Sequence, residues 1–150
     1  MRQNIYDDVK VLKGMSVAPA STVAGTTNGS KVDTLGADNA AVYAYGGLSS
    51  SNPSAATLAV TVQESADGST NWSNALDNTG TVIGFTLNCQ AALAENSARI
   101  EGLNLNRKRY LRAVVIAAFT GGTTPAIVGF AQIILGNNSP LPVNTTVSNT

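Results

Sequence analysis

Alternating apolar and polar residues form the dominant pattern along this chain. In the segment 57–64, Leu58, Val60 and Val62 recur at every second position, so all three face one side of an extended strand. The same reasoning predicts further strands over 41–45, 81–87 and 98–103. No apolar stripe with the period of a helix continues for more than about three turns. The pattern therefore predicts an all-β chain, with the Ala-rich segment 90–96 as the one place for a helical turn.

Two long apolar segments, 109–119 and 126–135, close the chain as a predicted hairpin around Gly121 and Gly122. Unlike the segment 57–64, they are apolar on both faces, which requires cover on both sides. Such cover comes either from two packed sheets or from a subunit interface. About seven strands at spacings of roughly ten to twenty residues predict a single β-sandwich or jelly-roll-like domain.

The regularity of the pattern divides the chain into three parts. Residues 1–36 are the least regular and predict an extended N-terminal arm or lead-in, in which Val9, Val11 and Met15 belong to an edge strand. Residues 37–136 carry the strands of the β-sandwich body. Residues 137–150 are rich in Asn, Ser, Pro and Thr and predict a C-terminal tail with almost nothing to bury.

Composition and charge narrow the function classes. Nine Lys and Arg balance nine Asp and Glu, and charged residues make up only 12% of the chain. A net charge of zero argues against nucleic-acid binding, which needs an excess of cations on one surface. Histidine is absent, which removes the commonest general base and the commonest metal ligand. We therefore expect no enzymatic activity, no metal and no cofactor.

Cysteine usage and hydropathy say little about compartment. The single cysteine, Cys89, has no partner for an intramolecular disulfide and is expected to be a small buried hydrophobe. The start of the chain lacks the apolar region of a signal peptide. The long uncharged segment 113–150 is broken by Gly, Pro and Asn before it reaches the length of a membrane span. We therefore expect neither a signal peptide nor a membrane segment.

Basic residues are concentrated in one short stretch, whereas the segment 113–150 carries no charge at all. The clustered residues are Arg99, Arg107, Lys108, Arg109 and Arg112. One interpretation is an attachment site for an acidic protein surface or a phosphate. The other is a set of solvated charges that prevents a strand edge from pairing wrongly, and we favour it for Arg107 and Lys108. Arg109 and Arg112 are expected to be paired within the fold or across an interface.

Three motifs, taken together and in order, resemble a known protein family. They are QESADGSTNW at 63–72, RKRYLRAVV at 107–115, and GFA at 129–131 followed by LGNNSPLPV at 135–143. In this order, and over roughly 35–143, they are similar to small virion proteins of tailed bacteriophages. In that family a strand ends in a Ser-x-Asp-Gly hairpin, a Lys-Arg-Tyr-x-Arg-Ala strand follows, and a Pro-containing tail closes the chain. The family consists of the capsid decoration, or cement, proteins.

The resemblance implies a structural function on the virion. Such a protein is a β-sandwich that binds the outside of an assembled capsid and stabilises it by bridging subunits of the major capsid protein. It is expected to be a homo-oligomer, with a trimer favoured, and to bind neither nucleic acid nor a membrane. Its place is the host cytoplasm during assembly and then the outer surface of the capsid.

The arm and the cationic cluster are the expected contact sites. Apolar residues that have little core of their own can be buried on a partner, and those of the arm are Ile5, Tyr6, Val9, Val11 and Leu12. We interpret these five as capsid-binding residues. A second group is expected at an oligomer interface or on the capsid: Arg107, Lys108, Arg109 and Arg112.

Two other functions fit the same residues. A tail-tube or head-to-tail connector subunit is the alternative within virions, and it would form hexameric rings. A carbohydrate-binding module of a tail fibre would stack sugar rings on Trp72, Tyr43 and Tyr45. The favoured interpretation of these three side chains is that they fill a core that is short of aromatic residues.

Overall fold

The computed structural model describes residues 9–11, 15–17, 24–100, 102–103 and 107–138, and these residues form strands and loops without a helix. The strands are β1 (Val9–Val11), β2 (Met15–Val17), β3 (Gly25–Asn28), β4 (Val32–Asp33), β5 (Ala37–Gly46), β6 (Ala55–Ser65), β7 (Ser73–Asn74), β8 (Gly84–Asn88), β9 (Ala94–Ile100), β10 (Tyr110–Thr120) and β11 (Gly129–Asn138).

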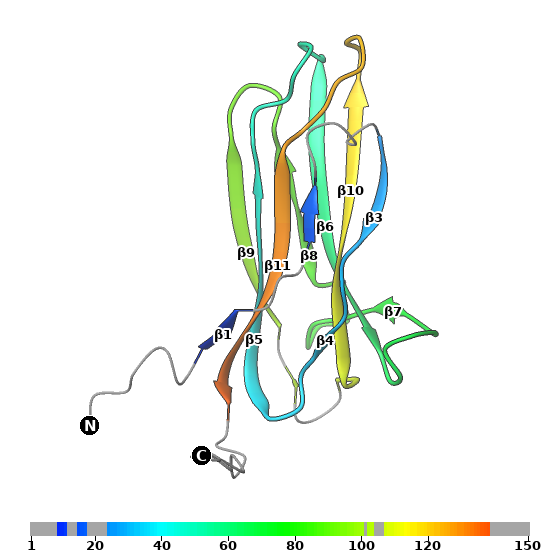
Figure 1. The fold of residues 1–150 in the computed structure, drawn as a ribbon, viewed down its shortest axis with the longest axis vertical. Helices are drawn as coiled ribbons and strands as arrows, with labels where there is room; N and C mark the ends of the chain where they lie inside the picture. The colour runs from blue at the N-terminus through cyan, green and yellow to red at the C-terminus, as the bar shows by residue number, and fades with distance from the viewer. Residues whose placement is uncertain (1–8, 12–14, 18–23, 101, 104–106, 139–150) are drawn as a thin grey trace, which may run out of the picture.

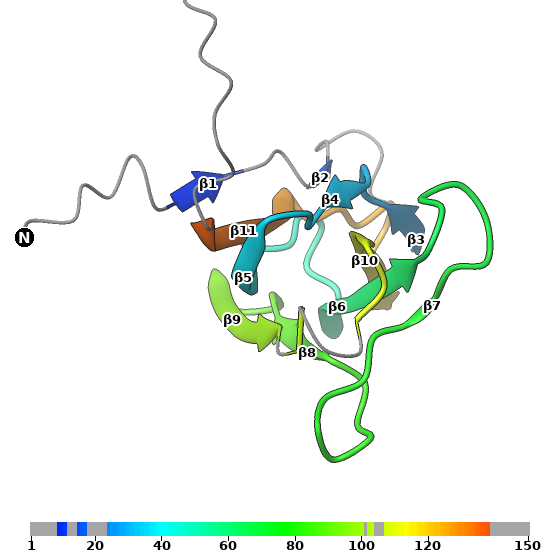
Figure 2. The same cartoon turned by 90° about the horizontal axis from the view of Figure 1, so that it is seen from below.

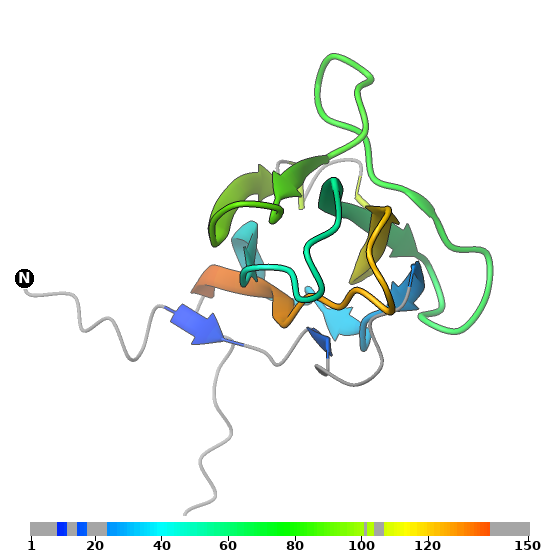
Figure 3. The same ribbon diagram turned by 90° about the horizontal axis from the view of Figure 1, so that it is seen from above.

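The strands form two antiparallel sheets (Figure 1). Sheet A has the order β1-β11-β5-β9, and β2 also pairs with β11. Sheet B has the order β3-β10-β6-β7, and β4 pairs with β10 while β8 pairs with β6. Figures 2 and 3, which look along the strands from below and from above, show the two sheets facing each other. The prediction of an all-β protein with a β-sandwich fold is confirmed.

Alternation along the strands places every second side chain between the sheets. On β6, Leu58, Val60 and Val62 are buried, as their spacing predicts. Val42 of β5 and Ile133 of β11 are buried from the side of sheet A. Burying side chains of this size contributes roughly 1.5 to 3 kcal/mol each. The core is therefore aliphatic, and all five side chains belong to one buried cluster.

The two closing strands do not form the predicted hairpin. β10 pairs with β6 along its whole length, β11 pairs with β5, and the connection 121–128 crosses between the sheets. In opposite sheets the apolar inner faces of β10 and β11 cover each other, which adjacent strands of one sheet cannot do. Cover on the outer face is only partial: Val114 is buried, whereas Ile116 is 42% exposed.

The lead-in supplies edge strands to both sheets. β1 and β2 pair with β11, so the edge strand predicted around Val9 and Val11 is present. The register of β2 on β11 differs by one residue from that of β1. β3 and β4 pair with β10, although both precede residue 37, where the body was predicted to begin. The sandwich therefore includes residues 25–33.

The helical turn predicted at 90–96 is wrong, because residues 94–96 begin β9. Ala94 lies opposite Gly46 and Asn96 lies opposite Ala44 in the register of β9 and β5. Helix propensity is a weak preference, and pairing along a whole strand of sheet A outweighs it here.

One end of the sandwich carries no charge, and we call it the uncharged end. It consists of the loops 46–54, 88–93 and 120–128. Gly46 lies opposite both Ala94 and Gly129, and Ala55 lies opposite Thr120, so the register brings these loops together.

The opposite end, which we call the charged end, gathers most of the ionic side chains. There Tyr110 lies opposite both Asp33 of β4 and Ser65 of β6. The charged residues of this end include Lys31, Asp33, Asp38, Glu64, Asp67, Asp77, Arg107, Lys108, Arg109 and Arg112.

Candidate interaction surfaces

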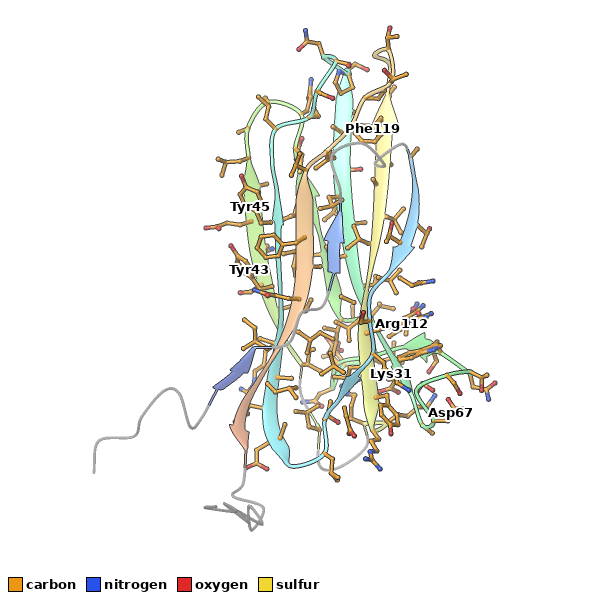
Figure 4. All side chains as sticks on the ribbon, in the orientation of Figure 1. Lys31, Tyr43, Tyr45, Asp67, Arg112 and Phe119 are labelled. Carbon is orange, nitrogen blue, oxygen red and sulfur yellow. The ribbon has the colours of Figure 1, made fainter. Side chains whose placement is uncertain are left out.

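Four of the five cations that cluster in the sequence lie where β10 begins, at the charged end, whereas Arg99 lies on β9 of sheet A, opposite Ala41. Figure 4 shows Lys31, Asp67 and Arg112 at this end of the sandwich. Lys31 comes from the loop between β3 and β4, so a lysine far away in the sequence joins the cluster. Each cation has a nearby partner, and the partners determine what the cluster can do.

Arg107 forms a nearly buried ion pair. Its Nη1 lies 3.4 Å from Oε2 of Glu64, and the two side chains are only 8% and 14% exposed. Its Nη2 donates to the carbonyl oxygen of Leu76 at 2.7 Å. The interpretation of Arg107 as a solvated charge is therefore wrong, because β6 supplies a carboxylate beside it. Lys108 donates from Nζ to the hydroxyl of Ser73 at 2.8 Å.

Arg109 and Asp33 form a two-pronged ion pair at the surface. Nε and Nη2 of Arg109 donate to the two carboxylate oxygens of Asp33 at 3.0 and 2.7 Å. These hydrogen bonds raise the pKa of Arg109 above its ordinary value. The side chains are 49% and 41% exposed, so solvent screens the pair and its contribution to stability is small. The expectation that Arg109 is paired within the fold is met.

Arg112 is held by an amide and an aromatic ring. Its Nε and Nη2 donate to Oε1 of Gln63 at 3.0 and 2.7 Å. Its guanidinium lies 4.3 Å from the centre of the Trp72 ring, a cation–π contact. Burial lowers the pKa of Arg112. Trp72 therefore presents a ring face to Arg112, and that face is not open to a sugar.

The loop after β6 is ordered by the carboxylate of Asp67. One carboxylate oxygen accepts the backbone N–H groups of Ser69 and Thr70, both at 2.9 Å. The other accepts the hydroxyl of Thr70 at 2.6 Å. These bonds, the Thr70 hydroxyl first, hold the pKa of Asp67 well below its ordinary value. Both carboxylate oxygens are used inside the loop and stabilise its turn.

Gly68 brings this loop into contact with β10. It has a φ of +67°, which favours glycine, and a Cβ there would lie 2.8 Å from the ring of Tyr110. The Tyr110 ring also has cations close by, with Lys31 Nζ 5.3 Å and the Arg109 guanidinium 5.2 Å from its centre. The Ser-x-Asp-Gly hairpin and the Arg-Tyr-Leu-Arg strand are thus one structural unit.

Loops at the uncharged end are tied to one another by backbone hydrogen bonds. Gly47 donates to the carbonyl of Val128 at 2.7 Å, and Ser49 donates to the carbonyl of Cys89 at 2.8 Å. Large apolar side chains are nevertheless exposed between these bonds: Leu48, Leu93 and Val128 are 59%, 61% and 49% exposed. Cys89 itself is buried, as predicted, and burial raises the pKa of its thiol.

Backbone strain also gathers at the uncharged end. Ser51, Asn52 and Thr124 have φ values of 63°, 44° and 51°, which is rare for residues with a side chain, and above all for a β-branched one. A Cβ on Gly122 would lie 2.9 Å from the carbonyl oxygen of Ser51, so the two loops pack backbone against backbone. Strain of this kind persists where the surroundings over-determine the conformation.

Three aromatic rings lie together on the outer face of sheet A. Tyr43 and Tyr45 of β5 flank Phe130 of β11, with ring centres 5.8 and 5.9 Å from it, and Figure 4 shows both tyrosines on that sheet. The Tyr43 hydroxyl donates to the carboxylate of Glu95 at 2.7 Å, and this bond raises the pKa of Tyr43. The interpretation that these tyrosines fill the core is wrong, because the core cluster contains neither.

A polar groove of about 590 Å³ opens beside β7 at the charged end. It is lined by Glu64, Ser73, Asn74, Leu76, Asp77, Asn78, Gly102 and Arg107. Arg107 and Glu64 pair with each other, and the Asp77 carboxylate accepts the N–H groups of Thr79 and Thr81. These bonds lower the pKa of Asp77, first through the Thr79 hydroxyl. The charged groups of the groove are therefore used within the fold.

The predicted arm residues lie mostly outside the described part of the chain. Ile5, Tyr6 and Leu12 are not described, and Val9 and Val11 are placed by their backbone in β1, opposite Gly136 and Ile134. The structure thus brings Arg107, Lys108, Arg109 and Arg112 together and places β1 on a different sheet from them.

Sequence reasoning missed the partners of the cations and the exposed apolar side chains. Glu64 and Asp33 are 43 and 76 residues away from the arginines that they bind, so no local pattern indicated these pairs. Leu48 and Leu93 carried a weaker signal, since each is a lone leucine in a loop of small or polar residues.

In the part of the chain that the structure describes, neither a metal-binding cluster nor a membrane-spanning helix was found, and the chain gave no match to a known protein. Within the described ranges there is no cluster of three or more His, Cys, Asp or Glu side chains suited to a metal. The same ranges contain no helix suited to crossing a membrane. Comparisons of the chain with protein-family models, with curated proteins and with solved structures found no match.

Proposed function

We propose that this chain is a structural, non-enzymatic virion protein that binds the outside of an assembled phage capsid and bridges subunits of the major capsid protein. The observation that carries the proposal is the unit formed by two motifs of the resemblance. Tyr110 packs on Gly68, and Arg112 binds Gln63 and stacks on Trp72. Motifs that depend on one another physically are a more specific signature than the same motifs taken singly.

Strand register supports a particular side of the molecule for attachment. Val9, in the first described strand, lies opposite Gly136, two residues before the end of β11 at Asn138. The chain therefore enters and leaves the sandwich on the same side. We propose that capsid contact is made on this side, through the arm residues Ile5, Tyr6, Val9, Val11 and Leu12. At the charged end Arg107 and Arg109 are paired with carboxylates and Arg112 is held by neutral groups of the fold, so attachment should depend only weakly on salt.

Multivalent attachment suits the proposed role. A homo-oligomer, for which the resemblance implies a trimer, presents several arms at once, and modest contacts then add up to firm binding. Bridging neighbouring capsid subunits stabilises the shell because the coat binds only the assembled form.

The copy number on the virion tests the proposal directly. Quantitation of the chain against the major capsid protein in purified virions should give hundreds of copies per particle. A copy number in the tens or below would contradict a coat and favour a connector or a fibre.

Two nested deletions locate the contact. Deletion of residues 1–8 removes Ile5 and Tyr6 but keeps β1, so the sandwich should stay folded while coating of shells is lost. Deletion of 1–12 also removes β1 and uncovers the edge of β11. The matched control is Leu93→Ser, which removes an exposed apolar side chain at the opposite end and should coat normally. Normal coating by the shorter deletion would contradict the proposed role of Ile5 and Tyr6.

The aromatic group on sheet A favours a second candidate, a carbohydrate-binding module. Tyr43, Tyr45 and Phe130 are only partly buried, and Glu95 lies beside them as a hydrogen-bonding group. Titration with host surface polysaccharides would detect binding, and Tyr45→Ala should abolish it. Absence of binding by the full chain would exclude this candidate for the glycans tested.

A further inference from the structure

The outer edge of β3 is the open edge of sheet B. β3 pairs with β10 on one side, and all four of its residues, Gly25–Asn28, are exposed. Figure 1 shows β3 at the right-hand margin of the sandwich, and Figure 2 shows it again at the periphery. Among the described strands, none pairs with its other side.

The hydrogen-bond pattern shows which backbone groups face outward. Gly29 donates to the carbonyl of Ala113 at 2.8 Å and continues the register in which Asn28 lies opposite Val114. Bonded and non-bonded pairs alternate in an antiparallel ladder. Thr26 and Asn28 are therefore the residues whose N–H and C=O groups point away from β10. Within the described ranges these groups have no protein partner.

This edge lacks the charges and prolines that often prevent strand addition. Residues 24–30 contain no charge and no proline. The far edge of sheet A, β9, carries Glu95 and Arg99, both exposed. The other margin of sheet B, at β8, lies beside β9 in Figures 2 and 3. Among these edges, β3 is therefore the one that is both open and uncharged.

The cross-strand row of residues that continues from this edge is uncharged as well. Thr26 lies opposite Ile116, which lies opposite Ala59, which in turn lies opposite Thr86. Ile116 is among the exposed large apolar side chains. Edge-to-edge pairing of two copies along this row brings no charged side chain into the contact, and depletion of charge is typical of interface cores.

We propose that β3 is a self-association site, at which β3 of one copy pairs antiparallel with β3 of a second copy across a two-fold axis. Centred on Thr27, this register places Thr26 of each copy opposite Asn28 of the other. The two pairs satisfy the outward N–H and C=O groups with about four hydrogen bonds. The strand is thus complementary to itself, which a two-fold contact requires. Lys31, the first charged residue after β3, lies beyond the paired segment.

The inference stands apart from the proposed function. A two-fold contact makes a dimer, or joins two larger oligomers if a trimer forms elsewhere on the molecule. Capsid coating does not require this contact. Coating can therefore fail while self-association is observed, and self-association can fail while coating is observed.

Sedimentation equilibrium of the full chain, from micromolar to millimolar concentration, measures the association. Wild type should show a reversible two-fold increase in mass. Thr26→Pro removes an outward N–H without touching the bonds to β10, and should raise the dissociation constant at least about tenfold. Thr26→Val keeps the N–H and the extended preference, and should associate like wild type. The proposal would be overturned if the mass of the wild type never doubled. It would also be overturned if Thr26→Pro associated as strongly as wild type.

Amide hydrogen exchange gives a second measurement that does not depend on a variant. The amides of Thr26 and Asn28 should exchange freely in dilute solution and become protected as concentration rises. Protection that appears only on adding purified phage shells would overturn self-association and assign the edge to a strand of the capsid. Free exchange at every concentration would overturn strand addition altogether.

Discussion

The charged and uncharged ends of the sandwich use their side chains in opposite ways. At the charged end, Arg107, Arg109 and Arg112 are bound by Glu64, Asp33 and Gln63, so its ionic groups are engaged within the fold. At the uncharged end, backbone hydrogen bonds hold the loops together, and the leucines at 48 and 93 point into solvent. Charge density alone would single out the wrong end as the more available surface.

The difference teaches that the partners of a cation cluster determine whether its charges are available to a ligand. A guanidinium that is paired and half-buried is engaged within the fold and offers little to a ligand. An exposed leucine contributes little to the fold and leaves apolar surface free for a partner. Removing the partner of a buried cation at the charged end should therefore cost stability, and replacing the exposed leucines of the uncharged end should not.

Breaking the buried ion pair should have the largest effect. Glu64→Ala leaves Arg107 nearly buried without its carboxylate and should lower the free energy of unfolding by about 3 kcal/mol. The control, Asp33→Ala, removes the exposed pair with Arg109 and should cost less than about 1 kcal/mol. Urea denaturation measures both, and equal losses would contradict the distinction between the two pairs.

Substituting the hairpin glycine should have the next largest effect. Gly68→Ala combines a left-handed backbone with a Cβ that would contact the Tyr110 ring, and should cost about 2 kcal/mol or more. Gly80 has a φ of +83° with nothing within 4 Å, so Gly80→Ala isolates the backbone strain and should cost about 1 kcal/mol. If thermal unfolding showed the two variants to be equally stable, the contact between the hairpin and β10 would be unimportant.

Acid should weaken the charged end through Asp67. Its pKa is lowered in the folded state, so the ionised carboxylate stabilises the fold at pH values above the ordinary aspartate pKa of about 3.9. This contribution is lost as the pH falls below that value toward the lowered pKa. Asp67→Asn should therefore flatten the acid side of a plot of unfolding free energy against pH. Parallel curves for wild type and variant would show that the loop bonds do not depend on this charge.

The smallest effect is expected at the uncharged end. Leu48→Ser and Leu93→Ser replace side chains that are mostly exposed, and should change the free energy of unfolding by less than about 0.5 kcal/mol. Leu58→Ala, a fully buried residue of β6, is the control and should cost roughly 2 to 5 kcal/mol. A large loss for either serine variant would mean that the leucine supports the loops rather than facing solvent.

Several parts of the fold follow from local pattern. Leu58, Val60 and Val62 are buried on one face of β6 because alternation is a property of neighbouring residues. The long apolar segments at 109–119 and 126–135 contain most of β10 and β11 for the same reason. The cationic residues of the candidate site were also visible as a cluster, and the internal pairing expected for Arg109 is present.

By itself, the sequence determined the all-β class, the places of the long strands, and the concentration of cations before an uncharged C-terminal quarter. Only the tertiary structure decided that β10 and β11 lie in opposite sheets, that Glu64 and Asp33 neutralise Arg107 and Arg109, and that β3 leaves an open edge. The physical reason is the separation in sequence between the residues that interact. Alternation acts between neighbours along the chain, whereas strand pairing and charge pairing join residues that are tens of positions apart and depend on which partners folding brings together.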